Sequence, residues 1–509
     1  APGVVGVGPG VVGVAPASAV SPCVVGIAPR LGVPTVRLGG QAASRPSGLG
    51  VRPPGAGGPT PTWLGPSSER PATDRGRRPS CSCVRAGGLR GLARVAGVLD
   101  GLDSIDWSQL EHAYGPAVDV PDQIRALISP EPERRDRALW ELYGNIFHQG
   151  TRYEASAYAV PFLLEILRER ATPDRAGVLN LLTSVAIGYD EAWLPDGFPV
   201  ARFREDARGG EEILRSTPPL GDGEGRIEHK FEYWNSLDSE SQNRVYASIE
   251  LAAYDAVRAG VPTFLDILAE PDATAEERVA AIYALAWFPE EAHQSVPALL
   301  RAAADPEPAV AASALVALGL VGSDAEVGAT VEAALDDPRD EVRWGAAIAL
   351  ARLRGPAAGR RVAEVLLAWT SVEDEEDEED EESGPSIPFL EGDLAGYAAE
   401  ALEQLGSEVD AEAFEAMLTR IPSVSGPEAL TLVGAALERP FPDGKVPEGQ
   451  PFAALTERQQ RLLTVLAESP QTWKFGDMAF GNFALMMRDH GLPASPEEMR
   501  RYVSGEAVR

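Results

Sequence analysis

The side chains that most often bind metal ions or act in catalysis are few in this sequence and stand far apart. The histidines are His112, His148, His229, His293 and His490, and the cysteines are Cys23, Cys81 and Cys83. None of the histidines belongs to an HExxH, HxxxH or Cys/His group, the spacings that place two ligands beside one metal ion. The sequence also lacks a GxxxxGK phosphate-binding loop and a GxSxG nucleophile elbow. We therefore expect a protein that is not an enzyme and that carries no metal and no cofactor.

A run of ten consecutive acidic residues, Glu373 to Glu382, is the densest charged feature of the chain. Mutual repulsion prevents such a run from packing, so we expect a solvated, disordered loop over residues 373–386. Three roles are open for it: keeping the protein soluble, docking to a basic protein or to the chain's own basic tail, and loose metal binding. No EF-hand spacing orders the carboxylates, which disfavours the metal-binding alternative.

The overall charge excludes a further class of function. The chain holds 45 basic and 77 acidic residues, for a formal net charge of −32. Residues 1–98 contain eleven arginines against Glu69 and Asp74, so residues 99–509 carry a formal charge of −41. Proteins that bind nucleic acid regardless of sequence neutralise phosphates with Lys and Arg, and a surface this acidic repels phosphates. We expect no nucleic-acid partner and instead a protein partner, with a basic protein as one option.

The first 97 residues differ from the rest of the chain. Glycine and proline fill 34 of the first 98 positions without a fixed period, a composition typical of disorder. This basic segment is either a native tail that folds back on the acidic body or upstream sequence that does not belong to the native protein. It holds all three cysteines, and the chain has no run of 18 apolar residues and no secretory leader. We therefore expect no membrane span and a cytoplasmic location.

From residue 99 onward, segments rich in leucine and alanine alternate with Asp-Pro, Ser-Pro, Glu-Pro and Gly signals, which is typical of successive helices. A Val-Pro motif followed by apolar residues occurs at 160–167, 261–268 and 296–300, and we expect each proline to start a helix. A partner helix is expected after Asp305-Pro306 and after Asp337-Pro338. The order Asp-Pro, Val-Arg, Ala, Ala-Leu, Leu resembles the HEAT-like repeat family, alpha-solenoid modules of paired antiparallel helices.

This resemblance implies an all-α fold, an alpha-alpha superhelix of HEAT-like repeats. It is close over residues 261–361 and loose over 119–188 and 387–440. A solenoid unit cannot bury its apolar face alone, so atypical segments are expected to cap both ends. The resulting organisation is a disordered segment (1–97), an N-terminal cap with helix pairs (98–188), an aromatic-rich insertion (189–245), HEAT-like repeats (246–372), an acidic loop (373–386), HEAT-like helices (387–440) and a C-terminal helical cap (441–509).

Two local expectations follow from helical spacing. Trp107, Leu110 and Tyr114 stand at that spacing and predict a helix in the N-terminal cap. In the helix after Asp337-Pro338, the same spacing directs Leu350 into the core and leaves Trp344 toward the edge of the repeat.

Two segments supply candidate partner-binding residues. The aromatic residues of the insertion either anchor a long loop onto the solenoid or, beside arginines, form a binding hot spot. The connection 145–154 is either a buried polar network at a repeat junction or a second part of the binding face. The residues that we single out for protein binding are His148, Arg152, Tyr153, Trp193, Phe231, Tyr233 and Trp234.

We expect the chain to be a non-enzymatic scaffold for protein–protein interaction that binds one protein along its concave face. Only three of the 45 basic residues are lysines, which is typical of a high-GC genome and indicates a bacterial source. Together with the expected location, this places the scaffold in a bacterial cytoplasm. One alternative is an enzyme or enzyme subunit that resembles the HEAT-like lyases of phycobilisomes. Another is an immunity or regulatory protein that neutralises a basic toxin or nuclease. Partner identity and oligomeric state stay open, because fold alone does not establish function.

Overall fold

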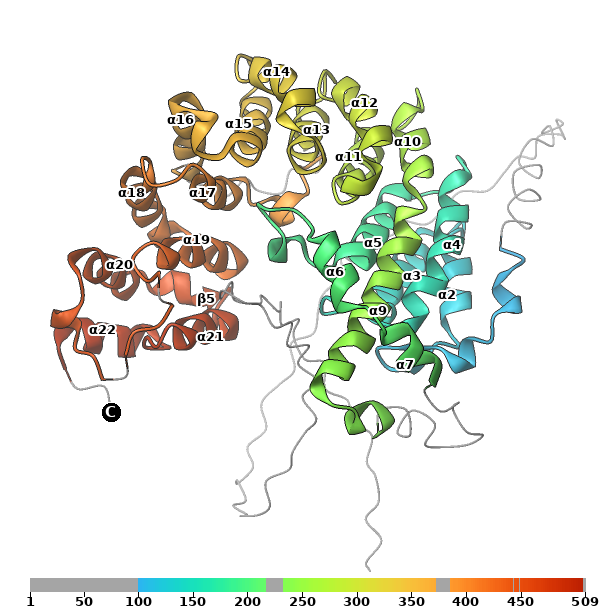
Figure 1. The fold of residues 1–509 in the computed structure, drawn as a ribbon, viewed down its shortest axis with the longest axis horizontal. Coiled ribbons are helices and arrows are strands. Elements are labelled where there is room, and N and C mark those ends of the chain that lie inside the picture. The colour runs from blue at the N-terminus through green and yellow to red at the C-terminus, as the bar shows by residue number, and fades with distance from the viewer. Residues whose placement is uncertain (1–98, 217–231, 372–384, 443, 448, 507–509) are drawn as a thin grey trace, which may run out of the picture.

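The described residues fold almost entirely as helices. The computed structural model describes residues 99–216, 232–371, 385–442, 444–447 and 449–506. The predictions of disorder for residues 1–97 and for the acidic run, and the binding role predicted for Phe231, fall outside this range. Figure 1 shows the helices following one another along an arc from α2 to α22, each with its bounds given below. This architecture confirms the all-α superhelix predicted from the repeat pattern.

The N-terminal part combines short hairpins with helix pairs. Its elements are η1 (Leu102–Ser104), η2 (Trp107–Gln109), β1 (Glu111–His112), β2 (Gly115–Pro116), α2 (Val120–Ala126), α3 (Pro132–Asn145), β3 (Phe147–His148), β4 (Thr151–Arg152), α4 (Glu154–Arg168), α5 (Arg175–Ile187), η3 (Asp190–Ala192), α6 (Val200–Asp206) and α7 (Gly210–Ser216). β1 pairs with β2 and β3 with β4, both antiparallel. Helix α2 packs on α3, and α4 packs on α5.

The middle of the chain is a double layer of helices. Its elements are α9 (Ser239–Arg258), α10 (Val261–Ala269), α11 (Ala275–Leu285), η4 (Pro289–Glu291), α12 (Ala292–Ala302), α13 (Pro308–Val321), α14 (Asp324–Ala334), α15 (Asp340–Arg354), η5 (Gly355–Ala358), α16 (Arg360–Thr370), η6 (Phe389–Gly392) and α17 (Leu394–Gln404). Figure 1 shows α11, α13 and α15 along the inner side of the arc and α10, α12 and α14 along its outer side. Each outer helix packs against the inner helix that follows it.

The C-terminal part has a core of its own. Its elements are α18 (Asp410–Arg420), η7 (Ile421–Ser423), α19 (Gly426–Glu438), η8 (Phe452–Ala454), α20 (Glu457–Glu468), η9 (Pro470–Trp473), β5 (Lys474–Phe475), β6 (Met478–Ala479), α21 (Gly481–Asp489) and α22 (Pro496–Ser504). Strands β5 and β6 pair antiparallel. Leu462, Phe483 and Met499 lie in the core that these helices share. The Ser495 side chain accepts a hydrogen bond from the Glu498 N–H, the N-cap that the Ser-Pro-Glu-Glu sequence predicts.

Small residues let the inner helices approach closely. A Cβ atom added at Gly345 of α15 would lie 2.7 Å from the Ala312 carbonyl oxygen of α13. A Cβ added at Gly319 of α13 would lie 2.7 Å from the Ala349 Cα of α15. The two backbones therefore touch at both points, and any larger side chain there would push the helices apart.

The Asp-Pro turns connect successive repeats through an arginine. Asp305 Oδ1 accepts the Glu307 N–H at 2.9 Å, and Asp337 Oδ1 accepts the Arg339 N–H at 2.9 Å. The Arg339 guanidinium also donates to the Asp305 carbonyl oxygen at 2.7 Å, which ties one repeat to the previous one. Hydrogen bonds from Arg339 lower the pKa of Asp337 to about 2.

Two of the three Val-Pro motifs do not start helices, which corrects the sequence prediction. Pro262 stands at the start of α10, as expected. Pro161 lies inside α4 and Pro297 inside α12. Each of these two helices begins at least one turn earlier, because the residues before the proline also favour helix. A helix can absorb one missing N–H donor when its apolar face is well packed.

Both expectations from helical spacing need correction. Trp344 is fully buried instead of lying toward the edge, because its Nε1 donates to the Leu394 carbonyl oxygen at 2.9 Å and its ring meets that of Tyr397. Residues 50 positions further along the chain thus cover the face of α15 that the repeat alone would leave open. In the N-terminal cap, the helix predicted over Trp107, Leu110 and Tyr114 does not form. Trp107–Gln109 is a short 3-10 turn, Leu110 is extended, and Tyr114 lies at the turn of the β1–β2 hairpin, which Gly115 and Pro116 favour over a helix.

The boundary predicted at residue 245 also needs correction. Residues 239–258 form one continuous helix, α9, whose N-cap Asp238 accepts the Ser241 N–H at 2.8 Å. The preceding residues contain η3, α6 and α7, and α6 and α7 both pack on α9. The described residues of the predicted insertion are therefore largely helical, and the insertion ends before α9.

The close approach of α13 and α15 gives a test of the packing. Replacing Gly345 with Ala should destabilise the protein by about 1–3 kcal/mol, because the new methyl group meets the Ala312 backbone. The matched control is Gly434→Ala in α19, where the nearest atom to an added Cβ lies 3.9 Å away and the higher helix propensity of alanine should leave stability unchanged or raised. Urea unfolding followed by circular dichroism measures both changes. Equal stability of the two variants would contradict the packing described here.

Candidate functional site

The hairpin of β3 and β4 brings together residues predicted to bind a partner. His148 is half-buried, and its Nδ1 lies 3.4 Å from the hydroxyl group of Tyr114, a residue that is 70% exposed. The guanidinium of Arg152 lies 3.2 Å from a carboxylate oxygen of Glu250 on α9. Tyr153 is half-buried, and burial raises its pKa to about 12. Within this segment, His148 and Tyr153 are therefore the predicted residues that keep some access to solvent.

The predicted residues of the aromatic-rich insertion pack inward. Trp193 donates from its Nε1 to the Ile187 carbonyl oxygen at 2.7 Å, and its ring lies 5.1 Å from that of Phe198. Tyr233 packs beside Trp234, whose ring centre lies 6.1 Å from that of Tyr246 on α9. These contacts are those expected of aromatic residues that anchor a segment onto the solenoid.

Two of the predicted contact residues need correction on grounds of burial. Arg152 is 5% exposed and Trp234 is 4% exposed. Arg152 is held by the Glu250 carboxylate, and Trp234 fills a small apolar cluster with Val245 and Ile249. A partner cannot reach either side chain without repacking the protein.

The two predicted segments nevertheless meet in the structure. Strand β4 packs against α9 through Arg152 and Glu250. Tyr246, one turn before Glu250, contacts Trp234 and lies near enough to Tyr153 to contribute to its raised pKa. The connection 145–154 and the end of the insertion therefore both pack against α9, and their sharing of one binding surface stays a prediction.

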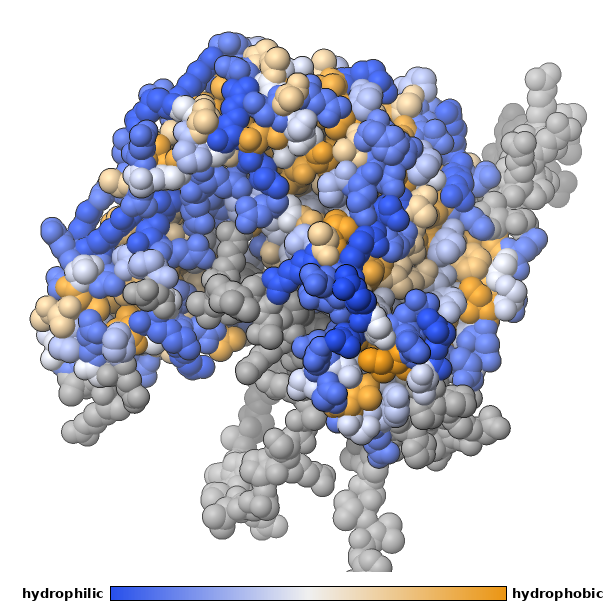
Figure 2. All heavy atoms as spheres, viewed as in Figure 1, coloured by the Kyte–Doolittle hydropathy of each residue, from blue (hydrophilic) through white to orange (hydrophobic). Residues whose placement is uncertain are grey.

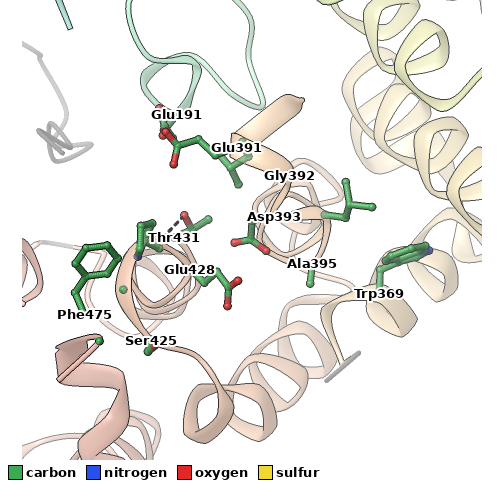
Figure 3. Close-up of a pocket in the computed structure, with 15 residues that line it drawn as sticks. Glu191, Trp369, Glu391, Gly392, Asp393, Ala395, Ser425, Glu428, Thr431 and Phe475 are labelled. Carbon is green, nitrogen blue, oxygen red and sulfur yellow. Dashed lines mark hydrogen bonds between the residues drawn. The ribbon is translucent and has the colours of Figure 1, made fainter. Parts of the chain in front are cut away.

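A pocket that the sequence did not reveal lies between distant segments of the chain. It has a volume of about 540 Å³ and lies among η3, η6, the first turns of α17 and α19, and the β5–β6 hairpin. Figure 3 shows the carboxylates and aromatic rings that surround it. Its acidic lining residues are Glu191, Glu391, Asp393 and Glu428, and its aromatic lining residues are Trp369 and Phe475. Of the described residues that line it, none is Lys, Arg or His.

Carboxyl groups meet at the upper wall of this acidic pocket. Asp190 is buried, and its Oδ2 accepts the Leu390 N–H at 3.0 Å. Burial raises the pKa of Asp190, although this hydrogen bond and one from Tyr283 oppose the rise. Burial, and then the neighbouring Asp190 and Glu391 charges, raise the pKa of Glu191 to about 8. The carboxyl groups of Asp190 and Glu191 therefore hold protons at a higher pH than isolated carboxylic acids do.

The backbone at η6 takes a conformation that non-glycine residues rarely adopt. Leu390 and Glu391 both have φ of +55°, in the left-handed region. Each such residue costs of the order of 1 kcal/mol and persists only when its surroundings hold it in place. The surroundings here include the ring of Phe389, which is fully buried and lies 5.1 Å from the Tyr283 ring and 6.3 Å from the Trp287 ring.

The floor of the acidic pocket is shaped by a close approach at a glycine. Gly426 has φ of +56°, and an added Cβ would lie 2.8 Å from the ring of Phe475. The ring can therefore lie directly over the start of α19, where it is 53% exposed. Glu428, two residues further on, lies 4.0 Å from the buried guanidinium of Arg420. The acidic pocket thus has an aromatic edge beside its carboxylates.

The chemistry of this lining suits an organic cation. Carboxylates accept strong hydrogen bonds from ammonium and guanidinium groups, and aromatic faces attract the same groups. Within the described residues, no three His, Cys, Asp or Glu side chains are grouped so as to hold a metal ion.

Sequence reasoning missed the acidic pocket because its parts are far apart along the chain. Asp190 and Leu390 are 200 positions apart, and the acids that line the pocket are four of 77. The available signal was local: Glu391, Gly392 and Asp393 directly follow a short apolar segment that no helical period explains.

The buried ion pair beneath the β3–β4 hairpin gives a stability test. Replacing Arg152 with Met should cost about 3–5 kcal/mol at pH 8, since Glu250 would be left charged and unpaired in the interior. The cost should shrink at pH 5, because burial already raises the pKa of Glu250 and the carboxyl would take up a proton. Adding Glu250→Gln to Arg152→Met should recover part of the loss at pH 8. A loss that is the same at both pH values would show that Glu250 is not the group left unpaired.

Comparison with known proteins bears on the repeats. The family of HEAT repeats matches residues 261–351 and 296–376. One similar solved structure is the crystal structure of an engineered protein from the Northeast Structural Genomics Consortium, with 18% identity, a TM-score of 0.23, and coverage of 69% of this chain and 89% of that chain. No curated protein matches the sequence. None of the described helices combines the length and apolar character that a membrane crossing requires. Residues 261–376 are HEAT repeats, within an alpha-alpha superhelix of HEAT-like repeats.

Proposed function

We propose that this chain is a non-enzymatic scaffold of a bacterial cytoplasm that binds a basic segment of a partner protein in the acidic pocket. The observation that carries the proposal is the pocket lining, which gathers four acidic residues and two aromatic rings and, among the described residues, has no basic side chain. Stacked helical repeats form extended surfaces suited to protein interaction, and residues 261–376 are such repeats.

A lysine or arginine side chain matches this lining in two ways. Its charged head can donate charge-assisted hydrogen bonds to the carboxylate oxygens of Glu391, Asp393 and Glu428. Its apolar stem, or the guanidinium plane of arginine, fits against the exposed ring of Phe475. The formal charge of −41 over residues 99–509 adds long-range attraction for a basic partner.

Part of the inner face of the repeats is filled by the chain itself, which leaves the acidic pocket as the site for the proposed partner. The concave-face binding expected from the sequence would need free inner surfaces on α11, α13 and α15. Phe389 packs on Tyr283 of α11 and on Trp287, which follows that helix, so part of that space is filled. Figure 1 shows η6 inside the arc, beside the inner helices. The acidic pocket begins where this covering segment ends.

The same lining favours one of the two alternative functions. An immunity or regulatory protein that neutralises a basic toxin or nuclease would use an acidic site, and the pocket provides one. Binding of that kind depends mainly on charge and weakens steeply as salt is added. Binding that also uses Phe475 should retain more affinity at high salt.

A peptide of alternating arginine and glycine, labelled with fluorescein, tests the acidic pocket by fluorescence anisotropy at physiological salt. The double variant Glu391→Gln/Glu428→Gln should bind it at least about tenfold more weakly than the unmodified protein, because a charge-assisted hydrogen bond is worth about 1.5–3 kcal/mol. Phe475→Ala should weaken binding further at high salt.

The matched control changes the same net charge elsewhere. Glu326 on α14 and Glu408 before α18 are exposed acids far from the pocket lining. The variant Glu326→Gln/Glu408→Gln should bind the peptide as the unmodified protein does. Equal weakening in both double variants would mean that overall charge attracts the peptide, and the acidic pocket would lose its proposed role.

A further inference from the structure

Two loops that are 200 residues apart meet inside the arc. The Leu390 N–H of η6 donates to Asp190 Oδ2 of η3 at 3.0 Å. Beside this bond, the Gln404 amide at the end of α17 lies 3.3 Å from Asp196 Oδ1. Figure 1 shows the loop after α5 reaching η6 across the inner side of the arc. We call the loops 190–196 and 389–393, together with these two bonds, the latch.

The charges at the latch oppose its closure. Glu191 follows Asp190 directly, and both lie close enough to Glu391 for its charge to raise their pKa values. From α11, Tyr283 donates its hydroxyl hydrogen to Asp190. Asp393 and Glu428 line the same pocket from the starts of α17 and α19, and the Arg420 guanidinium lies 4.0 Å from Glu428. The groups that face Glu191 from these elements are acids and one phenol.

The backbone of the latch is held under strain. Leu390 and Glu391 keep left-handed conformations, which a free loop would leave. The Asp190 carboxylate fixes the first of these residues through its N–H, and Phe389 fixes the segment before them through its buried ring. A loss of the Asp190 contact would therefore let the η6 loop relax away from η3.

We propose that the latch is a pH-sensitive device, closed while the carboxyl groups of Asp190 and Glu191 hold protons and loosened as these two groups ionise beside Glu391. It joins the early helices of the arc to α17 and so controls whether the segment that covers the inner helices stays in place. This inference does not depend on the proposed binding of a basic partner.

The sign of the pH dependence follows from the direction of the shifts. A carboxyl group with a raised pKa binds more protons in the closed state than in the open state. Closure is therefore fully favoured below the ordinary carboxyl pKa of 4.5 for Glu191 and is lost as the pH rises toward about 8. Asp190 shifts in the same direction and adds to the effect.

Hydrogen exchange of the full chain tests the latch without any ligand. Peptides that cover residues 385–393 should exchange at least about fivefold faster at pH 8.5 than at pH 5.5, after correction for the intrinsic pH dependence of amide exchange. Glu191→Gln removes one ionisable group, so it should reduce this difference at least twofold. Peptides from α13, which the latch does not hold directly, provide the internal reference.

Two further variants keep the test decisive. If Glu191→Gln folds poorly, Glu391→Gln replaces it, because residue 391 is exposed. Glu391→Gln should also reduce the pH dependence at least twofold. Glu326→Gln on α14 should leave the pH dependence unchanged. Equal protection of residues 385–393 at both pH values in the unmodified protein would overturn the proposal, and so would an undiminished pH dependence in Glu391→Gln. Because no peptide is present, failure of the proposed binding function would not affect either result.

Discussion

The backbone contact between α13 and α15 is the constraint on which the rest of the structure depends. Gly345 meets Ala312, and Gly319 meets Ala349, so no side chain separates the two helices. Such an interface cannot slide without collision, and it fixes how each repeat is placed on the next. The curvature set in this way carries loops from opposite parts of the chain, at Asp190 and Leu390, to one place. The acidic pocket exists because the arc is rigid enough to bring them there.

Part of the inner side of the arc is covered by the chain itself. Phe389 lies against Tyr283 and Trp287, and Leu394 accepts a hydrogen bond from Trp344. Apolar and small side chains on α11, α13 and α15 are therefore satisfied within the protein. The surface at the end of this covering segment is polar, because the acidic pocket lies there. A partner that binds on the concave side would therefore contact carboxylates and little apolar surface. The proposed basic partner follows from this order of surfaces.

The sequence predicts those parts of the fold that depend on neighbouring residues. The helix α15 begins after Asp337-Pro338 and Ser495 caps α22, as the sequence predicts, because helix starts and caps depend on neighbouring residues. The position of Trp344 was predicted wrongly, since the residue that buries it comes 50 positions later. The acidic pocket could not be predicted for the same reason on a larger scale. Its acidic residues come together only when the stacking of the repeats places their segments side by side.

The acidic residues of this chain occupy two opposite environments, and the difference between them points to function. Within the repeats, Asp337 is paired with Arg339, which lowers its pKa and joins adjacent turns. At the latch, Asp190 and Glu191 face other acids, and burial raises their pKa values. The chain uses arginines at its turns, yet none is found among the described residues that line this pocket. Such an arrangement is unfavourable for stability alone, so it is where perturbed titration and a role in binding or switching are expected together.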